Sequence, residues 1–159
     1  MKIRCLLPAA AHAVFAITLM AQATTPAAQP SPEEIAAERD RLMNEVLAAI
    51  KGRENEPAEA VFKDIRLFKS LPAGRIPRIM NLGFGRALGV SCTHCHVPGE
   101  WEKEDKPQKQ ITREMWELAG HITNERLPLI KNLDSAKPTV NCTTCHRGEV
   151  KPAVNLPAR

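Results

Sequence analysis

Two short motifs of the same form constrain this chain more than any other feature. Residues 92–96 read CTHCH and residues 142–146 read CTTCH, and the two copies use four of the five cysteines. The C-x-x-C-H pattern is typical of c-type haem attachment, in which two thiols add to the vinyl groups and the histidine binds the iron. The sequence therefore predicts two covalently bound haems c. The predicted attachment residues are Cys92, Cys95, Cys142 and Cys145, with His96 and His146 as proximal iron ligands.

Two other uses of paired cysteines are weaker interpretations. Zinc sites made of two C-x-x-C pairs commonly have the pairs about 15–20 residues apart, whereas residues 96–141 separate the pairs here. A thioredoxin-like pair lies beside a β-α-β pattern, and no alternating apolar run indicates strands in this chain. Neither use explains why a histidine follows each pair.

The N-terminal segment has the features of an export signal. A short basic start precedes an apolar run that ends near Met20, and residues 21–23 (AQA) form an A-x-A cleavage site. We predict a signal peptide over residues 1–23, cleaved after about Ala23, with an uncleaved anchor as the alternative. The fifth cysteine, Cys5, would leave with this segment. The exported chain would then carry cysteines only in its haem motifs, as expected of a periplasmic c-type haem protein.

Apolar spacing in the rest of the chain predicts an all-α fold in one domain. Ser31 can cap a helix that begins at Pro32 and stops at Gly52. Further helices are expected over residues 57–68, 77–89 and 112–127, with a loop over residues 97–111 and an extended tail from residue 148. The predicted division is a flexible lead over residues 24–32, an N-terminal helical segment over 33–71 and a dihaem module over 72–159.

Each haem iron also needs a sixth ligand or an open site. A thioether raises the reduction potential of a haem, whereas a second imidazole lowers it. Met80 precedes the first motif and Met115 lies between the motifs, so they are candidate distal ligands, although methionines at helical spacing are commonly core residues. His121 is the alternative to Met115, or else a surface group. His94, inside the first motif, is expected to point away from the iron.

The residues around the motifs resemble a known family. Residues 80–96 (MNLGFGRALGVSCTHCH) resemble a haem unit of the cytochrome subunit of photosynthetic reaction centres, and residues 112–118 with 140–148 resemble the next unit. In that family each unit is a helix with the axial methionine, a turn and then C-x-x-C-H. The resemblance implies a small multihaem cytochrome c module, with helix–turn–C-x-x-C-H units packed around two haems. It also implies that Met80 and Met115 are the distal ligands. That family has four haem motifs, whereas this chain has two.

These features predict an exported dihaem c-type cytochrome that relays single electrons and is not an enzyme. The expected partners are other cytochromes or a membrane-bound electron-transfer complex. Peripheral contact with the membrane is compatible with this expectation. The alternative is a dihaem peroxidase-type enzyme with one open haem site, for which His121 or Glu125 would be the acid–base group.

The charge pattern argues against a nucleic-acid partner. The formal net charge is +4, and the basic residues are scattered among acidic ones, as on an ordinary solvated surface. Four arginines flank the haem-bearing segments and are expected either to pair with haem propionates or to be surface charges. They are Arg75, Arg78, Arg86 and Arg147.

Overall fold

The computed structural model describes residues 29–155, and this part of the chain is helical, without a β-strand. The predicted all-α class is therefore confirmed for these residues. The predicted signal peptide over residues 1–23, and most of the lead over 24–32, lie outside the described residues. No helix within residues 29–155 combines the length and the apolar character needed to cross a membrane.

Helix α1 (Pro32–Ala49) begins where the sequence predicts. The Ser31 hydroxyl accepts a hydrogen bond from the Glu34 backbone N–H at 3.2 Å, and the Glu34 carboxylate accepts one from the Ser31 N–H at 2.7 Å. This capping box satisfies N–H groups that have no partner within the helix. The inner face of the helix buries Leu42, and the chain leaves the helix through the buried Ile50.

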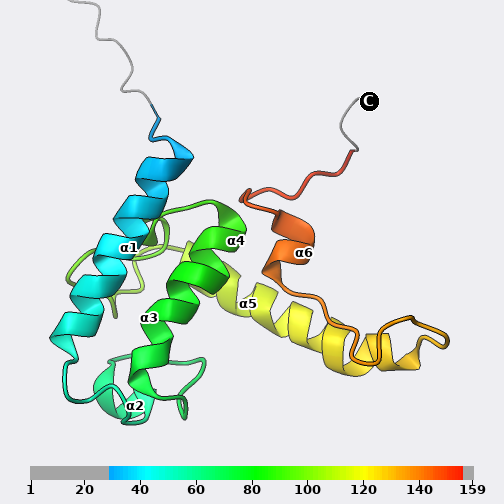
Figure 1. Cartoon of the computed structure of the whole chain (residues 1–159), viewed down its shortest axis with the longest axis horizontal. Helices are drawn as coiled ribbons and strands as arrows, with labels where there is room; N and C mark the ends of the chain where they lie inside the picture. Colours follow the sequence, from blue (N-terminus) through cyan, green and yellow to red (C-terminus); the bar gives the residue numbers. More distant parts are fainter. Residues whose placement is uncertain (1–28, 156–159) are drawn as a thin grey trace, which may run out of the picture.

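Arg39 joins α1 to the rod, a run of helical turns over residues 73–88 that lies beside α1 in Figure 1. Its buried guanidinium donates from Nε to Asn81 Oδ1 at 3.2 Å and from Nη1 to the Val90 carbonyl at 3.3 Å. Asn81 in turn donates to Asp40 Oδ1 at 2.7 Å, so the buried amide is also satisfied. These bonds join residues that are far apart in the sequence, between 41 and 51 positions, and hold α1 against the rod.

The segment after α1 departs from the prediction. The sequence predicts a helix over residues 57–68, but the helix found there, α2 (Ala58–Val61), is much shorter. The chain after α2 forms an irregular loop. Asp64 and Phe68 have φ values of 52° and 63°, which lie in the left-handed region and end a right-handed helix. The loop is closed instead by the Ala58 N–H, which donates to the Leu71 carbonyl at 2.8 Å.

The rod that leads to the first motif is continuous, but its helix type changes along its length. It consists of η1 (Ala73–Arg75), α3 (Ile76–Arg78), the π-helical η2 (Ile79–Gly85) and α4 (Arg86–Leu88). It ends at Gly89, whose φ of 65° is left-handed, as the glycine predicts. The wide π turn contains Met80, and such turns are frequent at functional sites.

The second half of the chain is built around a long helix that extends away from α1 (Figure 1). After η3 (Cys92–His94), helix α5 (Gln108–His121) continues through η4 (Ile122–Arg126) and η5 (Leu127–Leu129), and α6 (Cys142–His146) follows. Helix α5 begins four residues before Thr112, the predicted cap. Pro107 already has helical dihedral angles, and its carbonyl accepts from Ile111 N–H at 3.0 Å, so the helix starts without a side-chain cap.

Three aromatic rings join the loop, the rod and α5. Phe68 and Trp116 meet edge-to-face with centroids 4.8 Å apart, and Phe84 lies 5.9 Å from Trp116 and 6.3 Å from Phe68. Such tilted contacts suit the charge distribution of aromatic rings. The buried Phe84 thereby forms the partition between the two halves of the molecule.

Candidate haem-attachment sites

The first C-x-x-C-H motif faces a cavity of about 420 Å³ between α1, the loop after α2, the rod and the start of α5. The wall contains both thiols and the imidazole of the motif, Cys92, Cys95 and His96, together with Met80 from the π turn. The structure thus brings the predicted attachment, proximal and distal residues of the first haem to one cavity. Leu42 and Val46 of α1 are among its apolar walls.

The second motif faces a separate cavity of about 270 Å³ between α4, α5 and α6. Cys142, Cys145 and His146 line it, and Met115 enters from α5. The rest of the wall is mostly apolar. The two cavities share Phe84, Leu88 and Thr112, so one layer of side chains separates them.

The residues present suit a covalent haem in each cavity. Each site has two free thiols, and the two cysteines of a motif stand three residues apart on one helical turn, which directs them to the same side. Imidazole and thioether groups are both of the kind that ligate haem iron, and the apolar side chains of the walls suit a flat macrocycle. The cysteine pairs line different cavities, and within residues 29–155 no three metal-binding side chains cluster as a zinc site would require.

The hydrogen bond of each motif histidine leaves one ring nitrogen free. His96 Nδ1 lies 3.0 Å from the Trp101 carbonyl, and His146 Nδ1 lies 3.0 Å from the Glu149 carbonyl. A carbonyl can only accept, so in each ring Nδ1 carries the proton and Nε2 keeps its lone pair for a metal. Burial also lowers the pKa of His96, which favours the neutral imidazole that ligates. Burial raises the pKa of the Cys92, Cys95 and Cys142 thiols.

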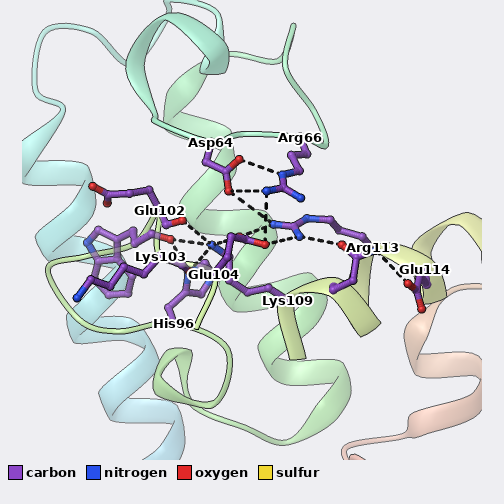
Figure 2. A network of polar contacts seen from close by, with 11 residues as sticks. Asp64, Arg66, His96, Glu102, Lys103, Glu104, Lys109, Arg113 and Glu114 are labelled. Carbon is purple, nitrogen blue, oxygen red and sulfur yellow. Dashed lines mark hydrogen bonds and ion pairs between the residues drawn. The ribbon is translucent and has the colours of Figure 1, made fainter. Parts of the chain in front are cut away.

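The two cavities differ in charge. Lys63, Arg66, Lys109 and Arg113 line the first cavity, together with two acidic residues, whereas the wall of the second contains no Lys, Arg, Asp or Glu. In the network of Figure 2, Glu104 accepts from Arg113 at 2.7 Å and pairs with Lys109 at 2.6 Å. These cations hold the pKa of the Glu104 carboxyl well below its usual range, with Arg113 as the main cause.

The arginines singled out in the sequence lie elsewhere. Arg75, Arg78, Arg86 and Arg147 are exposed, and none of them lines either cavity. The sequence did contain a signal for the residues that do line the first cavity. Lys109 and Arg113 are four positions apart, so they share one face of α5 beside the first motif.

The other two histidines of residues 29–155, His94 and His121, lie outside the first cavity. His121 is half exposed, and its Nδ1 lies 2.9 Å from Glu125 Oε2, outside the wall of the second cavity. His94 belongs to the first motif but lines the second cavity. It sits two residues after Cys92, and residues at that spacing on a helical turn point in different directions. Sequence reasoning placed His94 away from the first iron but missed its position beside the second site.

Two C-x-x-C-H turns that each face a cavity, in a chain that is helical over residues 29–155, define the class of c-type cytochromes. The chain belongs to the photosynthetic reaction centre cytochrome C subunit family, whose model matches residues 18–156. The predicted family resemblance is confirmed, and haem c is the cofactor of this class.

A curated relative agrees with this assignment. The chain is 31% identical over 99 residues to the photosynthetic reaction center cytochrome c subunit of Thermochromatium tepidum. The aligned part covers 60% of this chain but 22% of the relative. The chain therefore spans about a fifth of the length of that protein.

Proposed function

We propose that this protein is an exported dihaem c-type cytochrome that carries single electrons between redox proteins. The observation that carries this proposal is that each motif shares its cavity with a candidate methionine ligand. Met80 lines the first cavity, where Met43 is a second methionine, and Met115 lines the second cavity. When bound, each haem supplies an iron that gains and loses one electron. The residues around it would supply covalent anchorage, two iron ligands and exclusion of water, which together would set the potential.

The same arrangement favours a carrier over the peroxidase alternative. An enzyme of that type needs an open iron position with an acid–base group beside it. A methionine faces each cavity, and the acid–base candidates His121 and Glu125 pair with each other and line neither cavity. This placement supports Met115 over His121 as distal ligand of the second haem.

The N-terminal helical segment is proposed to be part of the same domain as the dihaem module. Helix α1 supplies Leu42, Met43 and Val46 to the first cavity and is fastened to the rod by Arg39. A haem in that cavity would be covered on one side by residues that precede position 72. Removal of α1 would therefore expose the first haem.

The second cavity offers the route for electron exchange with a partner. Cys145 is exposed, and Met115 keeps 41% of its surface accessible, so the edge of a haem held there would lie near the surface. We propose docking of periplasmic redox partners at this end. Another cytochrome or a membrane-bound electron-transfer complex would fit, and a small transient interface suits rapid turnover.

The experiment that tests the ligand assignment is the absorption spectrum of the ferric holoprotein and of methionine variants. We expect two low-spin haems with the charge-transfer band of methionine bound to iron. Met80→Ala and Met115→Ala should each remove the contribution of one haem to the absorbance of this band. Each substitution should also lower the reduction potential of that haem. Met43→Ala is the matched control, because Met43 also lines the first cavity. Loss of the band in Met43→Ala, or a high-spin haem that reduces peroxide, would contradict the proposal.

A further inference from the structure

One backbone carbonyl beside the first motif accepts two hydrogen bonds. The Trp101 carbonyl lies 3.0 Å from His96 Nδ1 and 3.1 Å from Lys109 Nζ. Figure 2 labels His96 and Lys109 in the same network. The proximal histidine of the first haem thus shares its hydrogen-bond acceptor with a charged ammonium group.

The position of the Lys109 ammonium is fixed by its other contacts. It donates to the Lys103 carbonyl at 2.9 Å and the Glu102 carbonyl at 3.3 Å, and it pairs with Glu104 at 2.6 Å. Its side chain is only 9% exposed. Arg113 pairs with the same Glu104 carboxylate, and Asp64 and Arg66 complete the cluster. Its three cations exceed its two carboxylates, so the cluster keeps a net positive charge.

The second motif has the same histidine–carbonyl bond without the competing cation. His146 Nδ1 lies 3.0 Å from the Glu149 carbonyl, and among residues 29–155 no lysine or arginine donates to that oxygen. The wall of the second cavity also contains no lysine or arginine. The two sites therefore differ in the surroundings of otherwise similar histidines.

This difference has a direct consequence for the reduction potential. A carbonyl that accepts from Nδ1–H raises the electron donation of the imidazole to the metal, which stabilises the ferric state. An ammonium on the same oxygen weakens that acceptor, and its positive charge opposes the added charge of the ferric iron. Both effects favour the ferrous state of the first haem.

We propose that Lys109 is a positioning residue that acts through the Trp101 carbonyl to raise the potential of the first haem above that of the second. The inference rests on the proposed function, since it requires a haem in each cavity. Electrons that enter at the more exposed second haem would then move to the first haem, because its reduction potential is higher.

The test is an optical potentiometric titration of the holoprotein and of Lys109→Met. The titration step of the first haem is assigned as the one that Met80→Ala moves. In Lys109→Met we expect the ferrous-to-ferric ratio of that haem to fall on the order of tenfold at a fixed ambient potential, which equals about 59 mV for one electron. The step of the second haem should not move. Lys109→Gln, which also removes the charge, should lower the same ratio.

Lys106→Met is the matched control. Lys106 is a half-buried cation next to the first motif, but its ammonium donates to the Thr93 carbonyl and not to Trp101. Its removal should shift the first haem less than the removal of Lys109. A second readout is the hyperfine-shifted proton signal of His96 Nδ1–H, which should move in Lys109→Met and stay in place in Lys106→Met.

The outcomes separate this inference from the proposed function. Equal shifts in Lys109→Met and Lys106→Met, or an unmoved first step in both Lys109 variants, would overturn the role of Lys109. If the wild-type protein itself showed one haem or a high-spin haem, the proposed function would fail instead.

Discussion

Glu104 holds together the cations at the rim of the first cavity. Its carboxylate accepts bonds from Arg113 at 2.7 Å on each oxygen and lies 2.6 Å from Lys109 Nζ, while its side chain is 34% exposed. A forked arginine–carboxylate pair is among the stronger polar contacts of proteins. Because Glu104 is bound in this way only in the folded state, the pKa of its carboxyl is lower there than in the unfolded chain.

The pH dependence of stability follows from this depressed pKa. We expect Glu104→Gln to lower the free energy of unfolding by about 1 kcal/mol at pH 7, after allowance for solvent screening. The contribution is present above the carboxyl pKa of the unfolded chain, about 4.3, and is lost as the pH falls towards the folded value. Urea unfolding at pH 7 and pH 3 should therefore show a difference between the two proteins that narrows in acid.

A surface ion pair offers the control for this prediction. Glu45 pairs with Arg41 on α1, but both side chains are more than half exposed, so Glu45→Gln should change stability less and with weaker pH dependence. An equal loss of unfolding free energy in both variants would show that the network around Glu104 contributes no more to stability than an exposed ion pair.

At the scale of the elements, the second motif is attached to the rod by a close approach of two backbones. The Gly148 N–H donates to the Ala87 carbonyl at 2.9 Å, just after α6 and just before the end of the rod. A Cβ at Gly89 would lie 1.9 Å from the Gly148 carbonyl oxygen. The glycine thus ends the rod and also allows the second motif to pack on it.

Gly89→Ala should damage this junction severely. The substitution adds left-handed strain and a backbone clash, and we expect a loss of about 3 kcal/mol or more in the free energy of unfolding. Gly52→Ala is the matched control, since Gly52 has a φ of 87° but no atom within 4 Å of the added Cβ. It should cost only the strain, about 1 kcal/mol. Equal losses in denaturant unfolding would contradict a close contact between the rod and the second motif.

At the scale of the whole molecule, the protein part has a small core. Within residues 29–155 the buried apolar residues are Leu42, Ile50, Ala58, Ala73, Ile76, Phe84 and Ala87, and three of these are alanines. Several apolar side chains of α5 remain exposed at the second cavity, including Ile111 at 55% and Leu118 at 49%. A bound macrocycle would cover such surface and add to the core.

We therefore expect the haem-free chain to lose its fixed tertiary packing. Expression without the haem-attachment machinery should give a chain with weak near-ultraviolet circular dichroism and partly retained helical signal, whereas the holoprotein should show both signals. The tryptophans Trp101 and Trp116 report on this packing. A haem-free chain with native-like near-ultraviolet dichroism would contradict the prediction.

Much of the fold could be predicted because its signals are local in the chain. The capping box at Ser31 and the left-handed Gly89 each depend on neighbouring residues, and both helix ends lie where the sequence indicates. The sequence predicts the start of α5 at Thr112 because a threonine can cap a helix, whereas the helix begins after Pro107, which already has helical dihedral angles. The helix expected over residues 57–68 failed because long-range bonds and packing impose left-handed turns there.

The sequence by itself determined the class of the protein, since haem attachment depends on cysteines and a histidine that are close in the chain. It also supplied Met80 and Met115 as candidate ligands, which stay predictions. Only the tertiary structure decided that the two motifs face separate cavities, that His94 lies at the second site and that Lys109 shares a carbonyl with His96. These arrangements depend on how a loop, a rod and a long helix pack in space, and no local spacing encodes that packing.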